Sequence, residues 1–488
     1  MRMRSVVNMT ILLTALTAGL GAAAGLIVLG MKGSLWDSVT VIVCVSGFIG
    51  AMLSLEFAVY ALLFLGLVEG VYKTIAPSLF TLVAKDVMLG FILVRLGYES
   101  LRNKDFSWIN QRLTVPAVLF IGYAFAMITA PSTQSPALAL AGVRSWILWI
   151  PLYYPVYVIF SNRTRVIRLL RTMCWVSMPV AAYGLYQSIM GYEHLRVSEE
   201  LYRHTLWYTG RAISIFNAPS LLGNFCALVI LASLGLTLYY PGLVRRGFFF
   251  GTAILAGGGL VASGTRGSFL GLLVGLLIFL ILARRKTLIV AIIALAGVIS
   301  FNYMVPTAEP GAERIRETIT PQIVVRRVTK PFEQALEQVT RYPLGYGVAT
   351  GAGSGRIYGE LRHEAGARGI EWIENEFGRV LSELGLPGLF FWLWMLWVAT
   401  RGAITAARTA ARDRDHYIFL AMTAGMFVLL SQLFIGGALY DAAAGIYFWI
   451  FAAMTARLPQ AFEEEQQAEE AEALALEPVE AQPVTASF

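Results

Sequence analysis

Three arginines occupy unusual positions at or inside apolar segments of the chain. Arg211 lies just before one apolar segment, Arg266 lies in the turn 263–267 between two of them, and Arg144 lies about two turns inside another. A guanidinium stays charged at any relevant pH and binds phosphate oxygens in a bidentate manner. Several guanidiniums at one membrane surface would suit a lipid-linked pyrophosphate, whose charge they would stabilise as it leaves. We therefore predict Arg211 and Arg266 as catalytic residues and Arg144 as a substrate-binding residue. The alternative for each is an ion pair with a nearby acid, or a side chain that reaches the membrane surface.

The glycines beside Arg266 are predicted to let the backbone approach a ligand closely. A second glycine-rich stretch covers residues 342–353, but it lacks the strand and helix that a nucleotide-binding loop requires.

Acidic and polar residues gather in the segment 371–388, which reads as a helix leading into an apolar segment with a break at Gly385 and Pro387. A carboxylate here could accept the proton of an attacking sugar hydroxyl, and Glu374 is the predicted catalytic base. The alternative is that the acids stabilise a helix N-terminus. The remaining predicted substrate-binding residues are His363, Asn375, Glu376 and Arg379.

The elements that must position these residues are membrane spans. Hydrophobic residues make up 57% of the 488 residues and charged residues only 14%, where a soluble domain carries roughly 25%. Apolar runs long enough to cross a bilayer recur along the chain. We predict an all-α polytopic membrane protein with 12–14 transmembrane helices, near residues 6–30, 37–54, 57–72, 79–97, 114–130, 138–160, 168–190, 216–239, 247–264, 267–283, 287–305, 386–400, 417–435 and 440–457.

Basic residues follow the positive-inside rule, because they gather in alternate loops while the opposite short loops 131–136 and 436–440 carry no charge. This predicts that both termini are cytoplasmic. The basic loops contain Arg95, Arg102, Lys104 and Arg112, then Arg163, Arg165, Arg168 and Arg171, then Arg245 and Arg246, then Arg284, Arg285 and Lys286, and finally Arg401, Arg408, Arg412 and Arg414.

The predicted spans and their orientation divide the chain into a transmembrane bundle (1–305), a large periplasmic loop domain (306–385), C-terminal transmembrane helices (386–458) and an acidic cytoplasmic tail (459–488). Within the loop domain, residues 331–340 have apolar residues at helical spacing, which predicts an amphipathic helix lying over the membrane. The tail is expected to be a frayed helix or disordered.

Other polar groups favour structural roles. The three cysteines, Cys44, Cys174 and Cys226, lie inside apolar runs and are expected to be packing residues without disulfides. Lys85 and Asp86 inside a span, with Glu69 nearby, favour a helix-to-helix ion pair over a proton relay.

The pair Asp413 and Asp415 has the spacing of a metal–nucleotide-sugar motif but lies in an arginine-rich loop, where a structural role is favoured. The four histidines have no metal-site spacing, so no metal is predicted. The net charge is +7, and the basic residues lie in short loops between spans. This distribution argues against nucleic acid as a partner.

Four segments, in this order and on one side of the membrane, resemble the O-antigen ligase/polymerase superfamily of bacterial envelopes. Residues 211–219 are similar to the family's Arg-x-x-Gly-x-Phe segment, residues 263–271 to its Ser-x-Ser-Arg-Gly element, residues 342–347 to its Pro-x-x-Gly-x-Gly loop, and residues 374–388 to its His-Asn segment before a span. Two positions depart from the pattern: Glu374 replaces the usual histidine, and Ser214 stands where glycine is common.

The resemblance implies a GT-C-like, metal-independent glycosyltransferase without a cofactor in the bacterial inner membrane. Its donor would be an undecaprenyl-pyrophosphate-linked glycan, and a chain-length regulator and a flippase are candidate partners beside membrane lipid. The absent histidine favours a polymerase of O-antigen or exopolysaccharide repeat units over a ligase that transfers the glycan to lipid A-core or protein. A lipid-linked glycan flippase and a structural scaffold are the alternatives from other classes.

Overall fold

The computed structural model describes residues 47, 49–50, 52–71, 79–130, 136–193, 211–283, 325, 329–350, 373, 375–410 and 413–476. In this part of the chain the regular structure is helical. The helices are α3 (Leu55–Leu67), α5 (Leu79–Asn103), η1 (Ser107–Ile109), α6 (Thr114–Ala126), η2 (Met127–Thr129), α7 (Pro136–Ile147), η3 (Ile150–Leu152), α8 (Tyr153–Ile159), α9 (Arg163–Met190), α11 (Pro219–Tyr239), α12 (Leu243–Ser263), α13 (Arg266–Leu282), α17 (Lys330–Arg341), α19 (Glu376–Thr409), α20 (Asp413–Gln432) and α21 (Ala442–Leu476).

The prediction of an all-α polytopic membrane protein is confirmed. Five stretches are long and apolar enough to cross a membrane: Pro136–Ile159, Pro219–Tyr239, Leu243–Ser263, Glu376–Thr409 and Ala442–Ala461. Of the fourteen expected spans, 6–30 and 287–305 lie outside the described residues, as does most of 37–54, and the other eleven coincide with described helices. The total of 12–14 spans stays a prediction.

Helix α11 forms the centre of the bundle. Every residue from Leu221 to Leu236 is buried, which is the pattern of a helix that is apolar on all sides and packed on all sides. Helix α13 approaches it closely at Gly275, where an added Cβ would lie 2.9 Å from Leu231 and 2.7 Å from Val428 of α20. The two cysteines described, Cys174 and Cys226, are free and buried in this core, as packing residues should be, whereas Cys44 lies outside the described residues.

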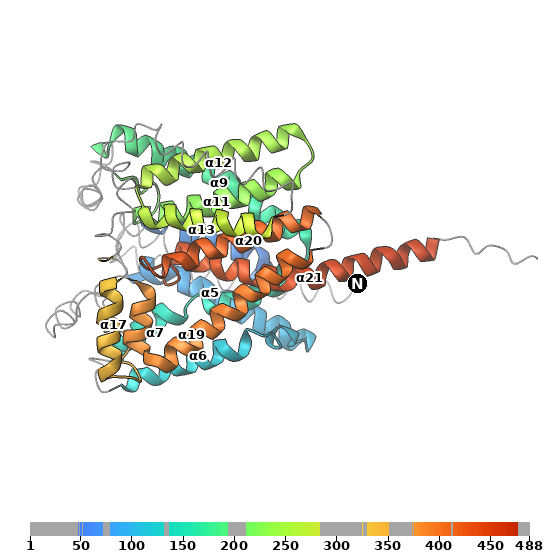
Figure 1. The fold of residues 1–488 in the computed structure, drawn as a ribbon. Helices are drawn as coiled ribbons and strands as arrows, with labels where there is room; N and C mark the ends of the chain where they lie inside the picture. The colour runs from blue at the N-terminus through green and yellow to red at the C-terminus, as the bar shows by residue number, and fades with distance from the viewer. Residues whose placement is uncertain are drawn as a thin grey trace, which may run out of the picture.

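The long helices run side by side, and the chain alternates between two ends of the bundle (Figure 1). One end, which we call the basic end, carries the loops between α5 and α6, α8 and α9, α11 and α12, and α19 and α20. At this end Arg163, at the start of α9, pairs with Asp415, at the start of α20, at 3.0 Å. By the positive-inside rule the basic end is expected to face the cytoplasm.

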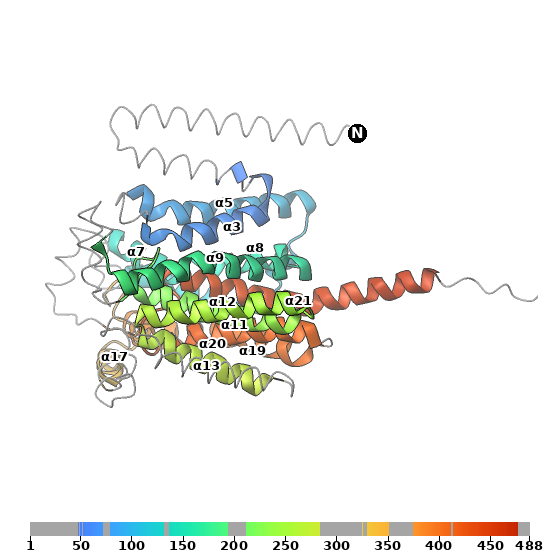
Figure 2. The ribbon, with the colours of Figure 1, turned by 90° about the horizontal axis from the view of Figure 1, so that it is seen from above.

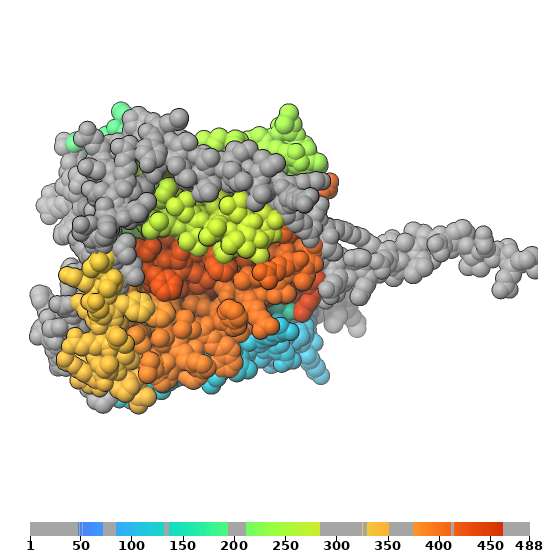
Figure 3. All heavy atoms as spheres, in the orientation of Figure 1, coloured from blue at the N-terminus to red at the C-terminus, as the bar shows by residue number. Residues whose placement is uncertain are grey.

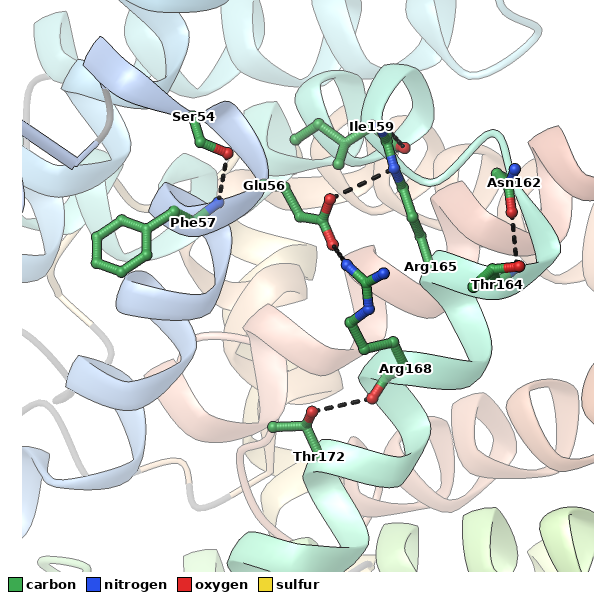
Figure 4. A network of polar contacts seen from close by, with 9 residues as sticks. All are labelled: Ser54, Glu56, Phe57, Ile159, Asn162, Thr164, Arg165, Arg168 and Thr172. Carbon is green, nitrogen blue, oxygen red and sulfur yellow. Dashed lines mark hydrogen bonds and ion pairs between the residues drawn. The ribbon is translucent and has the colours of Figure 1, made fainter.

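Helix α3 reaches the basic end through Glu56 in its first turn. The Glu56 carboxylate pairs with Arg165 at 3.3 Å and with Arg168 at 3.0 Å (Figure 4). Ser54 caps the same helix, since its side chain accepts a hydrogen bond from the Phe57 N–H. Seen from above, α3 and α5 form a layer beside α8 and α9 (Figure 2).

Helix α17 confirms the predicted amphipathic helix at residues 331–340, and it lies across the end of the bundle opposite the basic end (Figure 1). Its buried residues Ala335 and Val339 pack with Leu381 of α19, and Phe332 stacks on Phe377 with ring centroids 4.9 Å apart. The space-filling view shows α17 directly against the start of α19 (Figure 3). Its apolar stripe therefore packs on α19, and the expected position of the helix over the membrane stays a prediction.

Helix α19 begins ten residues before the expected span 386–400 and breaks at Gly385, where the backbone has φ +64° and ψ −164°. The predicted break at Gly385 is thus confirmed. The two sides of the break are fastened to the loop 342–350: Tyr346 N–H donates to Ser382 O at 2.8 Å and Leu386 N–H donates to Pro343 O at 3.0 Å. Helix α21 continues past Pro459 to Leu476, so the first part of the expected tail is helical.

The contact between the loop 342–350 and α19 requires a glycine at position 345. Its φ is +103°, and an added Cβ would lie 2.5 Å from the Glu383 carbonyl oxygen. We expect Gly345→Ala to destabilise the protein by about 2 kcal/mol or more, since it combines a left-handed backbone with a clash against backbone. The measurement is the melting temperature of the detergent-purified protein.

The matched control is Gly402→Ala, because an added Cβ at Gly402 meets nothing within 4 Å and alanine favours the helix. Equal melting temperatures for Gly345→Ala and the unchanged protein would contradict this account of the loop.

Candidate functional site

Arg211 and Arg266 lie together at the end of the bundle opposite the basic end. The Arg211 Nε donates to the Ser263 carbonyl at 3.1 Å and its Nη2 donates to Thr265 Oγ1 at 3.0 Å. The backbone is fastened at the same place, because Ala212 N–H donates to Ala262 O at 2.8 Å. Since Thr265 is the residue that precedes Arg266, the two arginines extend from adjoining backbone segments. Their joint role in binding a pyrophosphate stays a prediction.

Helix α13 adds a positive helix terminus to the two arginines. It begins at Arg266, and its N-cap residue Thr265 makes no side-chain capping hydrogen bond. The first N–H groups of a helix have no partner within the helix and carry partial positive charge. Two half-buried arginines and a helix N-terminus together form a site suited to an anion with several oxygens.

The glycines around Arg266 differ in role from the one expected. Gly264 has φ +53° and ends α12 in the left-handed conformation. At Gly267 an added Cβ would lie 2.5 Å from the Gln432 side-chain oxygen, and Gln432 donates to the Gly267 carbonyl. These glycines therefore allow a tight turn and a close contact with α20, where the sequence analysis expected a ligand.

The segment that carries Arg211 is held from the other side by Gln187 of α9. The Gln187 Oε1 accepts hydrogen bonds from Ile213 N–H at 3.2 Å and from Ser214 N–H at 2.7 Å. Ser214 has φ +53°, the backbone conformation that glycine adopts most easily. Its hydroxyl donates to the Val180 carbonyl at 2.7 Å. This explains in backbone terms why glycine is common at the position and how a serine is held there.

Arg379 is buried between two aromatic rings, with 5% of its surface exposed. Its guanidinium carbon lies 4.5 Å from the ring centroid of Trp146 and 4.0 Å from that of Tyr440, so both rings stabilise the charge. Within the described residues, Arg379 Nε and Nη2 have no hydrogen-bond partner. The Asp441 carboxylate, and next to it burial, raise the pKa of Tyr440, so this phenol stays neutral beside the guanidinium.

Asn375 and Glu376, at the start of α19, help to build the site. The Asn375 Oδ1 accepts from Gly378 N–H at 2.6 Å and so caps the helix, while its Nδ2 is buried with no hydrogen-bond partner within the described residues. The Glu376 Oε2 accepts from Ala438 N–H at 2.7 Å and Leu439 N–H at 2.9 Å. Glu376 therefore fixes the connection between α20 and α21, whereas Asn375 and Arg379 both have buried N–H groups without a hydrogen-bond partner within the described residues.

The two groups of residues are linked through α20. Gln432, which contacts Gly267 beside Arg266, also accepts a hydrogen bond from Gly436 N–H at 2.8 Å. The Gly436 carbonyl in turn accepts from Glu376 N–H at 2.9 Å. We call the end of the bundle that holds Arg211, Arg266, Asn375 and Arg379 the arginine end.

Arg144 forms an ion pair with Asp86. Its Nη2 donates to Asp86 Oδ1 at 2.9 Å and its Nε donates to Asp86 Oδ2. The neighbouring Lys85 pairs with Glu69, as the ion-pair interpretation of Lys85 and Glu69 predicted. Arg144 lies two residues before Trp146, the ring that contacts Arg379, so the pair with Asp86 fixes α7 near the site. Its predicted role in substrate binding stays untested.

Glu374 and His363, the remaining predicted site residues, lie outside the described residues. Asp413 and Asp415 lie at the basic end, far along α20 from the arginine end, and Asp415 is buried against Arg163. In the described ranges no group of three or more His, Cys, Asp or Glu could hold a metal ion.

Several residues that hold the site together were not predicted from the sequence. Glu383 accepts from Trp146 Nε1 at 2.8 Å and from Ala349 N–H at 3.2 Å, which fastens α7 and the loop 342–350 to α19. Gln187 and Gln432 act in the same way on the arginine segments. The available signal was the presence of amide side chains inside apolar helices, where a polar group needs a partner.

The segment 251–393 matches the family model described as O-antigen ligase. This match confirms the predicted resemblance to the O-antigen ligase/polymerase superfamily. It covers the second part of α12, all of α13 and α17 and the first half of α19, and so contains Arg266, Asn375 and Arg379, while Arg211 and Arg144 precede it. No curated protein matches the chain significantly.

Ser214 offers a test of the backbone at the site. We expect Ser214→Gly to be more stable than Ser214→Ala by about 1 kcal/mol, because both variants lose the hydroxyl and glycine alone accepts a positive φ without strain. Melting temperatures of the two purified variants measure the difference. If Ser214→Ala were as stable as Ser214→Gly, the left-handed conformation at this position would be refuted.

Proposed function

We propose that this protein of the O-antigen ligase superfamily polymerises undecaprenyl-pyrophosphate-linked oligosaccharide repeat units at the periplasmic face of the inner membrane. The family implies a membrane enzyme with O-antigen ligase or polymerase activity that uses a lipid-linked glycan. The observation that carries the proposal is the contact of the Arg211 guanidinium with the turn from which Arg266 begins α13. Their position opposite the basic end is the one that a periplasmic site requires.

The donor pyrophosphate would bind at Arg211, Arg266 and the N-terminus of α13. In the transfer step, a hydroxyl oxygen of the acceptor sugar bonds to the anomeric carbon of the donor glycan. The bond from that carbon to the pyrophosphate oxygen breaks, and its electron pair leaves with undecaprenyl pyrophosphate. The arginines stabilise the charge that develops on this leaving group more strongly than that of the bound donor, which lowers the barrier.

The acceptor would bind near the start of α19. Asn375 Nδ2 and the Nε and Nη2 groups of Arg379 are buried donors without protein partners within the described residues, and sugar hydroxyls can accept such hydrogen bonds. Glu374 precedes Asn375 in the chain and is the proposed base that accepts the proton of the attacking hydroxyl. His363 and Arg144 are proposed to contact the substrate at the edge of the site.

The acceptor distinguishes polymerase from ligase. The polymerase proposal is supported by Glu374, which replaces the histidine typical of the ligase pattern. The description of the matching family favours a ligase as the second candidate. Purified protein in nanodiscs, supplied with the lipid-linked donor and either a second lipid-linked unit or lipid A-core as acceptor, separates the two by the product that forms.

Loss of either catalytic arginine should abolish chain growth. We expect Arg211→Gln and Arg266→Gln each to lower the rate of transfer about 100-fold or more, because each removes a charged donor from the leaving pyrophosphate. The measurement is the length distribution of glycan formed in nanodiscs. The matched control is Arg245→Gln, an exposed arginine at the basic end, which should leave the products unchanged. Normal chains from both site variants would overturn the proposal.

The proposed base can be tested separately from donor binding. We expect Glu374→Gln to lower kcat about 100-fold or more with little change in KM for the donor, since an amide cannot take the proton but keeps the shape of the side chain. Glu333→Gln, an exposed acid in the first turn of α17, is the control. A normal kcat for Glu374→Gln would assign the base to another residue.

A further inference from the structure

A large cavity lies at the basic end, away from Arg211, Arg266, Asn375 and Arg379. Its volume is about 920 Å³, and it is enclosed by the connection between α5 and α6, by α8, by the second half of α19 and by α21. A volume of this size is typical of sites for small organic ligands. Neither the transfer reaction nor the arginine end uses it.

Aromatic and small side chains form the walls of this cavity. Trp394 and Trp397 of α19 face it on one side and Tyr153 and Tyr157 of α8 on the other. Trp397 is 61% exposed, and Leu393 and Phe390 on the same helix are also exposed apolar residues that a bilayer would cover. The apolar wall is therefore continuous with the lipid-facing surface of α19.

The polar lining of the cavity is positively charged. Among the described residues that line it are Arg112 before α6, Arg401 of α19 and Arg457 of α21, against a single carboxylate, Asp105. The Asp105 Oδ1 already accepts a hydrogen bond from Ser107 N–H at 2.9 Å. Three arginines from three elements thus line one cavity at the basic end.

We propose that this cavity binds an anionic phospholipid of the adjacent leaflet, with its phosphate on Arg112 and Arg401 and an acyl chain along Trp394 and Trp397. The charge of the lining selects an anion. The continuity of the tryptophan wall with the bilayer surface selects a lipid over a soluble phosphate, because tryptophan favours the boundary between head groups and acyl chains. This site is independent of the proposed glycan transfer.

The charge requirement is tested with phosphatidylglycerol as the probe and phosphatidylcholine as its uncharged counterpart. We expect native mass spectrometry of the full chain to show phosphatidylglycerol bound, and the double variant Arg112→Gln/Arg401→Gln to bind it at least about tenfold more weakly. The control is Arg245→Gln/Arg246→Gln, which removes the same charge at the same end outside the cavity. Equal binding of phosphatidylglycerol by both double variants, or equal binding of the two lipids, would overturn the proposal.

The position of the lipid is tested by filling the cavity without changing its charge. Gly402 lines the cavity, and an added Cβ there meets nothing within 4 Å. We expect Gly402→Phe to reduce phosphatidylglycerol binding at least about tenfold, while Gly247→Phe, equally open but in α12, leaves it unchanged.

Two results would contradict a lipid in this cavity. One is undiminished phosphatidylglycerol binding by Gly402→Phe, which would indicate nonspecific attraction to the basic end. The other is displacement of phosphatidylglycerol by an equal concentration of glycerol 3-phosphate, which would assign the site to a soluble anion.

Discussion

A guanidinium or ammonium group inside a membrane protein keeps its charge only if other groups replace the water it has lost. Each cation inside this bundle meets that condition in a particular way, and the arrangement of the helices follows from it. Lys85 pairs with Glu69, Arg144 pairs with Asp86, and Arg379 lies between two aromatic rings. Arg211 donates to oxygens of the 263–265 turn, which fixes its guanidinium beside the start of α13.

The two ends of the molecule use arginine for different purposes. At the basic end, Arg163, Arg165 and Arg168 join helices through Asp415 and Glu56, so these charges fix the packing as well as the expected orientation. At the arginine end, the charges gather around a helix terminus and a buried asparagine amide. Arginine therefore contributes to the expected orientation of the protein in the membrane at the basic end and to the proposed transfer reaction at the arginine end. The net charge of the chain could not distinguish these two roles.

Hydropathy predicted the spans because a membrane helix must be apolar over a fixed length, whichever helices surround it. It gave no information on which helices touch, so the contact of Trp146 with Arg379, or of Gln187 with the Arg211 segment, could not be foreseen. Arg211 and Arg266 were proposed as site residues from residue type and position, and the contact of Arg211 with the turn before Arg266 lies between two spans that the sequence places correctly. The break at Gly385 was also predictable, since glycine followed by proline interrupts a helix locally. The packing of α17 on α19 was not, because an amphipathic stripe does not reveal which apolar surface it covers.

The break in α19 divides that helix into two parts. Residues 376–384 are bonded to the loop 342–350 and to the connection between α20 and α21. The loop also holds the part after the break, because Leu386 N–H donates to Pro343 O, and it is bonded to α6 through the Tyr123 hydroxyl. Asn375 and Arg379 at the start of α19 are therefore joined through this loop to helices inside the bundle, so a substitution that displaces the loop would also disturb the position of both residues.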